Sequence, residues 1–161
     1  MTASPTRPSK PLQTILVAGL VAGTFDITYA CVFYYARNGA TPPMIFRSVA
    51  RGPLGPSARD GGIKVAILGL FFHYLIAMIV SAIYFFASRV IPFMIEHAVI
   101  SGLIYGLCVY FVMYGLVMRY SAIHSTIYPW QYPWGVLIPN LLIHMLGIGV
   151  TIAVIVRKLS R

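Results

Sequence analysis

Charged side chains are scarce in this chain, and acidic ones are the scarcest. Three Asp or Glu and twelve Lys or Arg make up 9% of the 161 residues, whereas a soluble domain carries about 25% charged residues. With so few carboxylates, the acid pairs used by hydrolytic enzymes are poorly supplied. A nucleophile elbow and a phosphate-binding loop are absent as well. We therefore expect no enzyme of a conventional class.

Cysteine is nearly absent too, which argues against a disulfide framework. Cys31 and Cys108 both lie within apolar runs. The spacings CxxC, CxxCH and HxxxH, which would indicate a metal or haem site, do not occur, and no cofactor is predicted from motifs. Nucleic-acid binding is not expected either, because the cations lie in loops and at the ends of apolar runs, where anionic lipid headgroups attract them.

What the chain does have is long apolar runs. Hydrophobic residues make up 59% of it, and the mean hydropathy is +0.83. A membrane-spanning helix needs roughly 20 mostly apolar residues, and four runs are long enough: 12–36, 65–88, 91–118 and 134–156. None alternates with the period of two that β-barrel spans show. The sequence therefore predicts an all-α integral membrane protein, a four-transmembrane-helix bundle at residues 12–158 that follows a disordered tail at residues 1–11.

The longest connection, residues 37–64, is basic and rich in glycine and proline. Its segment "MIFRSVAR" predicts one or two helical turns on the membrane interface, with Met44, Ile45 and Val49 toward the bilayer. The residues expected on lipid headgroups are Arg47, Arg51 and Arg59. A solvated basic loop without helix is the alternative.

A similar short pattern occurs in both halves of the chain. "GLVAG" at 19–23 and "GLIYG" at 102–106 carry glycines four residues apart, and the run after each carries "HYLIAM" or "HMLGIG". Glycines with this spacing share a helix face and let two helices approach closely. The two halves would then be parallel hairpin repeats. The glycines expected at helix contacts are Gly19, Gly23, Gly69, Gly102, Gly106 and Gly147.

Three ionisable residues stand inside the predicted spans. Asp26 shares a helix face with Gly19 and Gly23, and His73 and His144 lie on small or polar faces of their own helices. Each lies roughly 14–16 Å from the same membrane side, near the middle of a ~30 Å hydrocarbon core. One intramembrane cluster of Asp26, His73 and His144 is the simplest arrangement. Residues that could support it are Asn140, Tyr105 and Ser81.

Three functions are compatible with such a cluster. A hydrogen-bonded core that only fixes helix register would belong to a non-catalytic accessory or structural subunit. A proton or ion path through an Asp–His relay would belong to a transport protein. A metal site of two imidazoles and one carboxylate, or a haem held by His73 and His144, would belong to a redox subunit. Four helices enclose little room for a path, so we expect a homo-oligomer or a larger membrane complex. All three functions stay open.

The second half of the chain resembles a group of known proteins. The stretches "SGLIYGLCVYFVMYG" from Ser101, the "YPW" segments and "LLIHMLGIGVTIAVIVR" up to Arg157 are similar to small uncharacterised bacterial inner-membrane proteins of the YagU-like type. The similarity extends over residues 95–158. It implies a multi-pass helical bundle in the bacterial inner membrane, with undefined biochemistry and no catalytic residues to assign.

Overall fold

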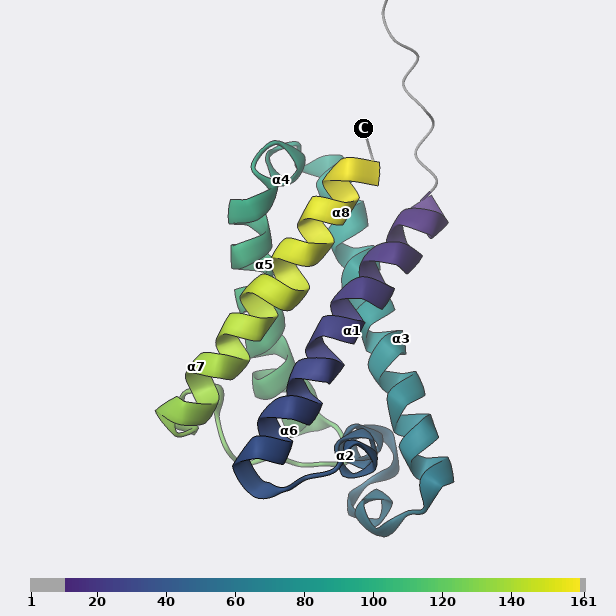
Figure 1. Cartoon of the computed structure of the whole chain (residues 1–161). Helices are drawn as coiled ribbons and strands as arrows, with labels where there is room; N and C mark the ends of the chain where they lie inside the picture. Colours follow the sequence, from purple (N-terminus) through teal and green to yellow (C-terminus); the bar gives the residue numbers. More distant parts are fainter. Residues whose placement is uncertain (1–10, 160–161) are drawn as a thin grey trace, which may run out of the picture.

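The computed structural model describes residues 11–159, which form helices joined by loops (Figure 1). Four helices are long and apolar enough to cross a membrane: α1 (Pro11–Asn38), α3 (Ile63–Val90), a continuous helix Ala98–Tyr120 and another, Trp134–Leu159. No strand occurs between residues 11 and 159, so the predicted all-α fold with four long apolar helices is confirmed. The disordered tail was expected at residues 1–11, and residues 1–10 lie outside the described part of the chain.

The third and fourth long helices each contain a π-helical segment. The third runs from α5 (Ala98–Phe111) through η2 (Val112–Val117) to α6 (Met118–Tyr120), and the fourth from α7 (Trp134–Leu142) through η4 (Ile143–Val150) to α8 (Thr151–Leu159). Pro139 lies inside α7, shortly before η4 begins. Proline has no N–H, so Pro139 leaves the carbonyl of Gly135 without its usual i to i−4 hydrogen bond in the first turn of α7.

The third long helix starts later than its apolar run. The run begins at residue 91, but residues Phe93–Glu96 form a separate short helix, α4, and the long helix begins only at Ala98. His97 separates the two with φ −111° and ψ 49°, outside helical geometry. Hydropathy alone did not reveal this break, because the residues around Glu96 and His97 are apolar enough to extend the run.

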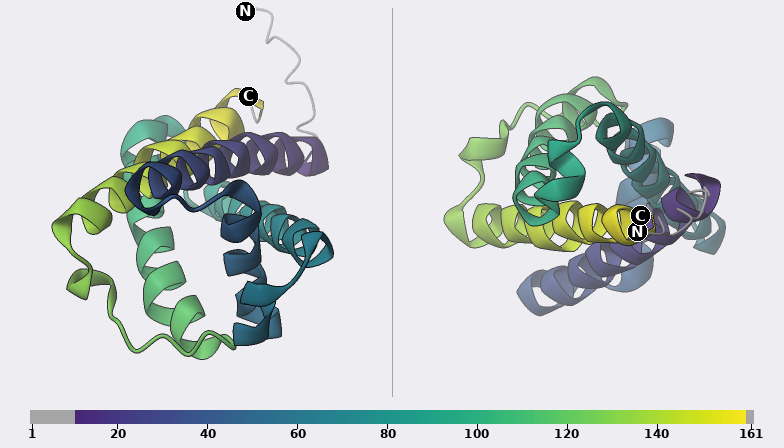
Figure 2. Two further views of the ribbon diagram at one scale, coloured as in Figure 1. Left: turned by 60° about the horizontal axis from the view of Figure 1, so that its bottom comes forward. Right: turned by 90° about the horizontal axis from the view of Figure 1, so that it is seen from above.

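Residues 37–64 contain more helix than expected. α2 (Pro42–Leu54) has 13 residues and is followed by η1 (Pro56–Asp60), a 3₁₀ turn. Gly55, at φ 79°, ends α2 in a conformation that glycine adopts readily. α2 lies across one end of the bundle beside α3 (Figure 2). The two backbones touch at Gly69, where an added Cβ would collide with the carbonyl of Phe46.

A glycine pair holds the first helical hairpin together. Gly19 and Gly23 of α1 face α3, where an added Cβ would stand 2.6 Å from the Sδ of Met78 and 3.0 Å from the Cβ of Ala77, respectively. The absent side chains of these two glycines thus leave the room that Met78, Ala77 and Tyr74 of α3 occupy against α1.

The second hairpin is tighter. A Cβ at Gly102 would lie 2.7 Å from the Cα of Val150, and a Cβ at Gly106 would collide with the carbonyl of His144. A Cβ at Gly149 would in turn collide with the carbonyl of Gly102. Both hairpins thus pack through the glycine pair of their first helix.

The glycine of the last helix that touches the third helix is Gly149, which the sequence did not single out. An added Cβ at Gly147, the expected position, would lie 3.7 Å from the Cβ of Phe25 in α1, an ordinary contact, and 2.5 Å from the side chain of Ile143 in its own helix. The expectation assumed the 3.6-residue period of an α-helix, and the π-helical η4 does not follow that period.

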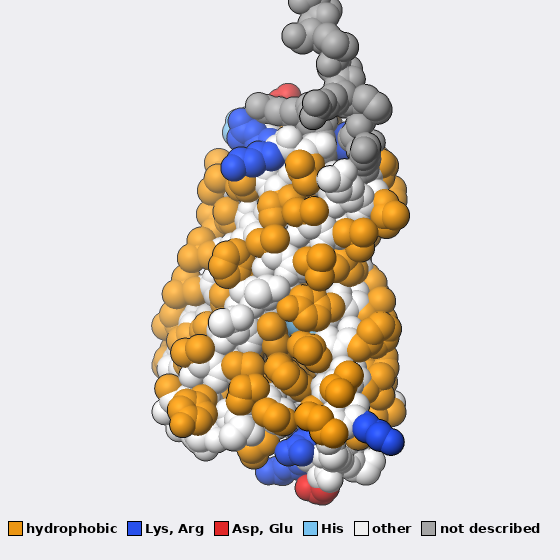
Figure 3. All heavy atoms as spheres, turned by 45° about the vertical axis from the view of Figure 1, so that its right-hand side comes forward, with side chains coloured by type: hydrophobic (Ala, Val, Ile, Leu, Met, Phe, Trp, Pro, Cys, Tyr) orange, Lys and Arg blue, Asp and Glu red, His pale blue; other side chains and the backbone are white. Residues whose placement is uncertain are grey.

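The two ends of the bundle are packed differently. Toward the ends Pro11 and Leu159, the helices enclose a compact core of Ala18, Ala22, Tyr84, Phe85, Ala98, Ile152, Ala153 and Val156. Toward α2 they separate around a cavity. On the face that Figure 3 shows, hydrophobic side chains cover the long helices, and the Lys, Arg, Asp and Glu side chains in view lie at the two ends.

Replacing Gly102 by Ala should destabilise the protein, because its Cβ would press on the backbone of Val150 and Gly149. Overpacking of this kind costs about 1–3 kcal/mol, and a thermal unfolding scan in detergent would detect it. Gly52→Ala is the matched control, since nothing lies within 4 Å of its added Cβ. Equal unfolding temperatures for the two variants would contradict the close contact of α5 and η4.

Candidate functional site

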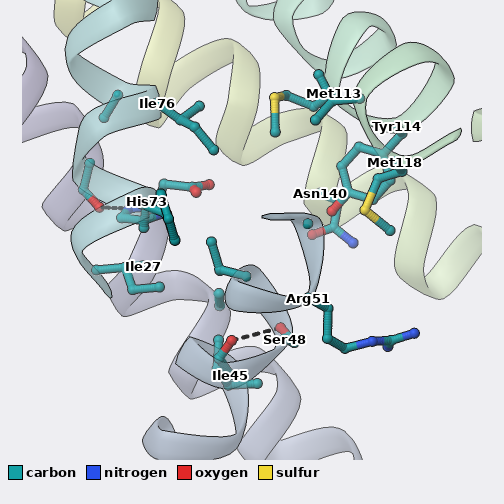
Figure 4. A pocket seen from close by; sticks show the side chains of 18 of the residues that line it. Ile27, Ile45, Ser48, Arg51, His73, Ile76, Met113, Tyr114, Met118 and Asn140 are labelled. Carbon is teal, nitrogen blue, oxygen red and sulfur yellow. Dashed lines mark hydrogen bonds between the residues drawn. The ribbon is translucent and has the colours of Figure 1, made fainter. Parts of the chain in front are cut away.

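A cavity of about 840 Å³ extends from α2 into the bundle (Figure 4). All four long helices and α2 contribute to its wall, and its inner end lies against Ala22 and Ile152 of the compact core. The three ionisable residues singled out from the sequence, Asp26, His73 and His144, all line it. The fold therefore brings residues from three long helices to one internal space.

His73 is tied to the neighbouring helix through its ring. Its Nε2 lies 2.8 Å from the backbone carbonyl oxygen of Gly23. A carbonyl can only accept, so Nε2 carries the proton and donates it. In the neutral imidazole Nδ1 is then left as the acceptor. The same bond fixes the register of α3 against the glycine pair of α1.

His144 has the opposite tautomer. Only 7% of the residue is exposed, and its Nδ1 donates to the carbonyl of Asn140 at 2.8 Å, which leaves Nε2 as the acceptor. Edge-to-face contacts with Tyr110 and Tyr114, at centroid distances of 5.5 and 5.8 Å, hold the ring in place. Each histidine thus keeps one basic nitrogen that the backbone does not use.

Asp26 makes no hydrogen bond or ion pair with any residue between 11 and 159. The side chains of Tyr29 and Tyr114 line the cavity together with it. The Tyr29 hydroxyl is itself buried and has no hydrogen-bond partner in the described part of the chain. Asp26, His73 and His144 therefore share a cavity and are not linked by hydrogen bonds to one another.

The supporting residues have separate places. Asn140 lines the cavity and donates through Nδ2 to the Val136 carbonyl at 2.9 Å and to the Tyr34 hydroxyl at 3.4 Å. Tyr105 and Ser81 do not line the cavity. They donate to the backbone carbonyls of Val80 and Ile15, at 2.7 and 3.1 Å, and so connect helices next to the compact core.

The arginines expected on lipid headgroups lie beside the cavity. Arg47 and Arg51 are half-buried, Arg59 is exposed, and all three contribute to its wall near α2. Arg47 donates from Nη1 to the carbonyl of Gly61 at 2.7 Å. The apolar side of α2 also faces the cavity, because Ile45 and Val49 line it.

The geometry gives the metal hypothesis no support. Among residues 11–159, no three His, Cys, Asp or Glu side chains lie close enough together to hold a metal ion. A haem would require only the two imidazoles of His73 and His144, and that hypothesis stays a prediction.

Sequence reasoning missed the tyrosines of the cavity. Tyr29 follows Asp26 by one helical turn, and Tyr114 continues the face of Gly106 and Tyr110 at steps of four residues. This periodicity could have identified both. Tyr132 comes from the loop before α7 and lines the cavity as well. Burial raises the pKa of Tyr132, the Ser125 side chain opposes this shift and Tyr34 adds to it, so the Tyr132 phenol stays neutral at physiological pH.

No family model, curated protein or solved structure matches the chain. The resemblance of its second half to YagU-like proteins therefore stays a prediction.

If the cavity holds water, a cysteine placed on its wall should react with a charged methanethiosulfonate reagent. We expect Met113→Cys, in a Cys31→Ser, Cys108→Ser background, to react at least about tenfold faster than Leu116→Cys, because only a hydrated thiol ionises readily. Both positions belong to η2, but Met113 lines the cavity and Leu116 lies on the outer apolar surface. Labelling rates measured by mass spectrometry in detergent would decide. Equal rates would mean that the cavity is closed to water.

Proposed function

We propose that this is a multi-pass membrane transport protein in which the cavity binds a solute and Asp26, His73 and His144 exchange protons with it or with water. The single observation that carries the proposal is the cavity of about 840 Å³ that all three residues line. The location, the shape of the cavity and the chemistry of its wall each support one part of the proposal.

Membrane insertion is supported by the outer surface. α1 and α3 have 28 residues each, which at 1.5 Å per residue is roughly 42 Å, longer than a ~30 Å hydrocarbon core. Large apolar side chains such as Phe25, Phe71 and Leu146 are exposed along the long helices. Exposed apolar surface of this extent would be unfavourable in water and is expected against lipid.

The cavity argues for transport over a purely structural role. Protein interiors are close-packed, with few voids larger than a water molecule. A core that served only to fix helix register would pair its polar groups and fill the space between them. Here Asp26 has no hydrogen-bond or ion-pair partner between residues 11 and 159. In each histidine, one ring nitrogen is hydrogen-bonded to a backbone carbonyl and the other ring nitrogen is not.

The residues of the wall suit proton exchange. An imidazole gains and loses a proton near neutral pH, and ionisable residues inside a membrane commonly mark ion or proton pathways. The compact core closes the cavity at the end near Pro11 and Leu159. Transport through it would require the two hairpins to part at this end, as in alternating access between structural repeats.

A non-catalytic accessory subunit is the second candidate, and one observation favours it. The imidazoles of His73 and His144 donate hydrogen bonds to the backbone carbonyls of Gly23 and Asn140. These bonds alone would give both histidines a structural role. On this account, changing either histidine would lower stability without any effect on transport.

We infer the bacterial inner membrane as the location, on the resemblance of residues 95–158 to YagU-like proteins. Lipid is then the immediate partner of the apolar surface. We also propose a homo-oligomer or a larger membrane complex, since four helices enclose little room for a path that crosses the whole membrane.

Asp26→Asn should abolish most proton movement while leaving the fold intact, because the carboxylate has no partner to lose between residues 11 and 159. Purified protein in liposomes with an internal pH dye would be given an imposed pH gradient. We expect the wild type to dissipate it and Asp26→Asn to do so at least about tenfold more slowly. Unfolding temperatures of the two proteins should agree closely.

Glu96→Gln is the matched control, since Glu96 is an exposed carboxylate in α4 and does not line the cavity. Its flux should equal that of the wild type. Equal flux in Asp26→Asn and the wild type would overturn the proposed role of Asp26. Loss of folded protein in Asp26→Asn would favour the accessory-subunit alternative.

A further inference from the structure

The α2 end of the cavity carries cationic groups that lack partners. Arg51 is half-buried and makes no hydrogen bond or ion pair within residues 11–159. Its Nε and that of Arg47 are shielded from solvent and have no hydrogen-bond partner in the same part of the chain. Arg47 uses only Nη1, on the Gly61 carbonyl. Buried polar groups are normally paired, so two guanidinium groups with donors to spare indicate a missing acceptor.

The charge balance at this end favours an anion. Arg59 adds a third cation to the wall, and Asp60 is the acidic residue beside it. Guanidinium groups bind carboxylate and phosphate oxygens through two parallel hydrogen bonds. In Figure 4, Arg51 extends from α2 toward the side of the cavity on which Tyr114 and Met118 lie. An oxyanion held between α2 and that wall would meet its donors.

Beyond the arginines the wall is mainly apolar. Ile27, Ile76, Met113 and Ile148, from four long helices, line the inner part. The volume of about 840 Å³ is within the range of roughly 300–1,000 Å³ that small-molecule sites occupy. A purely ionic solute would leave these apolar side chains against water, whereas a molecule with an apolar body would cover them.

Asp26 restricts where a negative charge can lie. It stands twelve residues before the end of α1 at Asn38, roughly 18 Å along the helix axis. An ionised carboxylate there repels a second anion in its neighbourhood. The headgroup of an anionic ligand is therefore favoured near α2, with its apolar part directed inward.

We propose that the cavity binds an amphiphilic anion, with a carboxylate or phosphate headgroup on Arg47 and Arg51 and an acyl chain along the apolar inner wall. Amphiphilic anions would then be the substrate class of the cavity, an inference that rests on the transport function proposed above. A membrane protein can receive such a ligand directly from the lipid phase, because free fatty acids and lysophospholipids dissolve there.

Native mass spectrometry of the full-length protein, released from non-ionic detergent, would test this with three probes that share one acyl chain. Oleate carries a carboxylate, 1-oleoyl lysophosphatidate a phosphate, and monoolein no charge. We expect one anion per chain and at least about tenfold weaker binding of monoolein, since a charge-assisted hydrogen bond is lost. Tighter binding of one of the two anions would assign the headgroup chemistry.

Variants at Arg51 locate the headgroup. Arg51→Gln should weaken anion binding at least about tenfold, while Arg51→Lys, which keeps the charge, should retain most of it. Arg37→Gln is the matched control, because Arg37 is an exposed cation at the same end that does not line the cavity. A gel-filtration profile like that of the wild type shows that each variant is folded.

Equal binding of monoolein and oleate, or equal binding by Arg51→Gln and the wild type, would overturn the proposal. The result is separable from the transport function. If the protein binds the anion and Asp26→Asn leaves the proton flux unchanged, the proposed ligand is supported and proton exchange at Asp26 is refuted. If proton flux depends on Asp26 and no anion binds, proton exchange is supported and the proposed ligand is refuted.

Discussion

Close approach of helices at glycines is the constraint on which the rest of this structure depends. Within each hairpin, a glycine pair on the first helix removes the side chains that would otherwise keep the helices apart, at Gly19 and Gly23 in one and at Gly102 and Gly106 in the other. These close contacts extend to the cavity, because Gly23 lines it, as does His144, which Gly106 touches. At the opposite end from the compact core, α2 and Tyr132 of the loop before α7 contribute to the cavity wall. The cavity follows from tight packing at one end and spacing at the other.

The sequence predicted what depends on local periodicity. Asp26 had to share a face with Gly19 and Gly23 because an α-helix repeats every 3.6 residues, and that face turned out to border the cavity. The four long helices followed from hydropathy in the same way. Gly149, which makes the backbone contact with Gly102, was not expected, because the period changes inside η4. The place of Arg47 and Arg51 could not be predicted, since it depends on the contact of Phe46 with Gly69, far along the chain.

Depth within the bundle separates two chemical environments in one cavity. Near α2 the wall is cationic, with Arg47, Arg51 and Arg59, and further in it is apolar with Asp26, His73 and His144 among the apolar side chains. Each histidine combines a structural and a chemical role. One ring nitrogen donates a hydrogen bond to a backbone carbonyl, and the other is left as an acceptor. A transport site needs both properties: side chains held in fixed positions, and groups that can still exchange protons or bind a ligand. The two π-helical segments supply Tyr114 and His144 to this wall, as π-helical turns often do at functional sites.

Both proposed roles require the cavity between α2 and the compact core to hold water and to admit a ligand. A cryo-electron microscopy structure of the protein in a lipid nanodisc, with a rigid binder to add mass, tests it most directly. We expect α2 to lie across the end of the bundle and non-protein density to lie between Arg51 and the inner wall near His144. A bundle in which α2 lies out on the membrane surface, with the long helices collapsed together and side chains filling the space around Asp26, would contradict it.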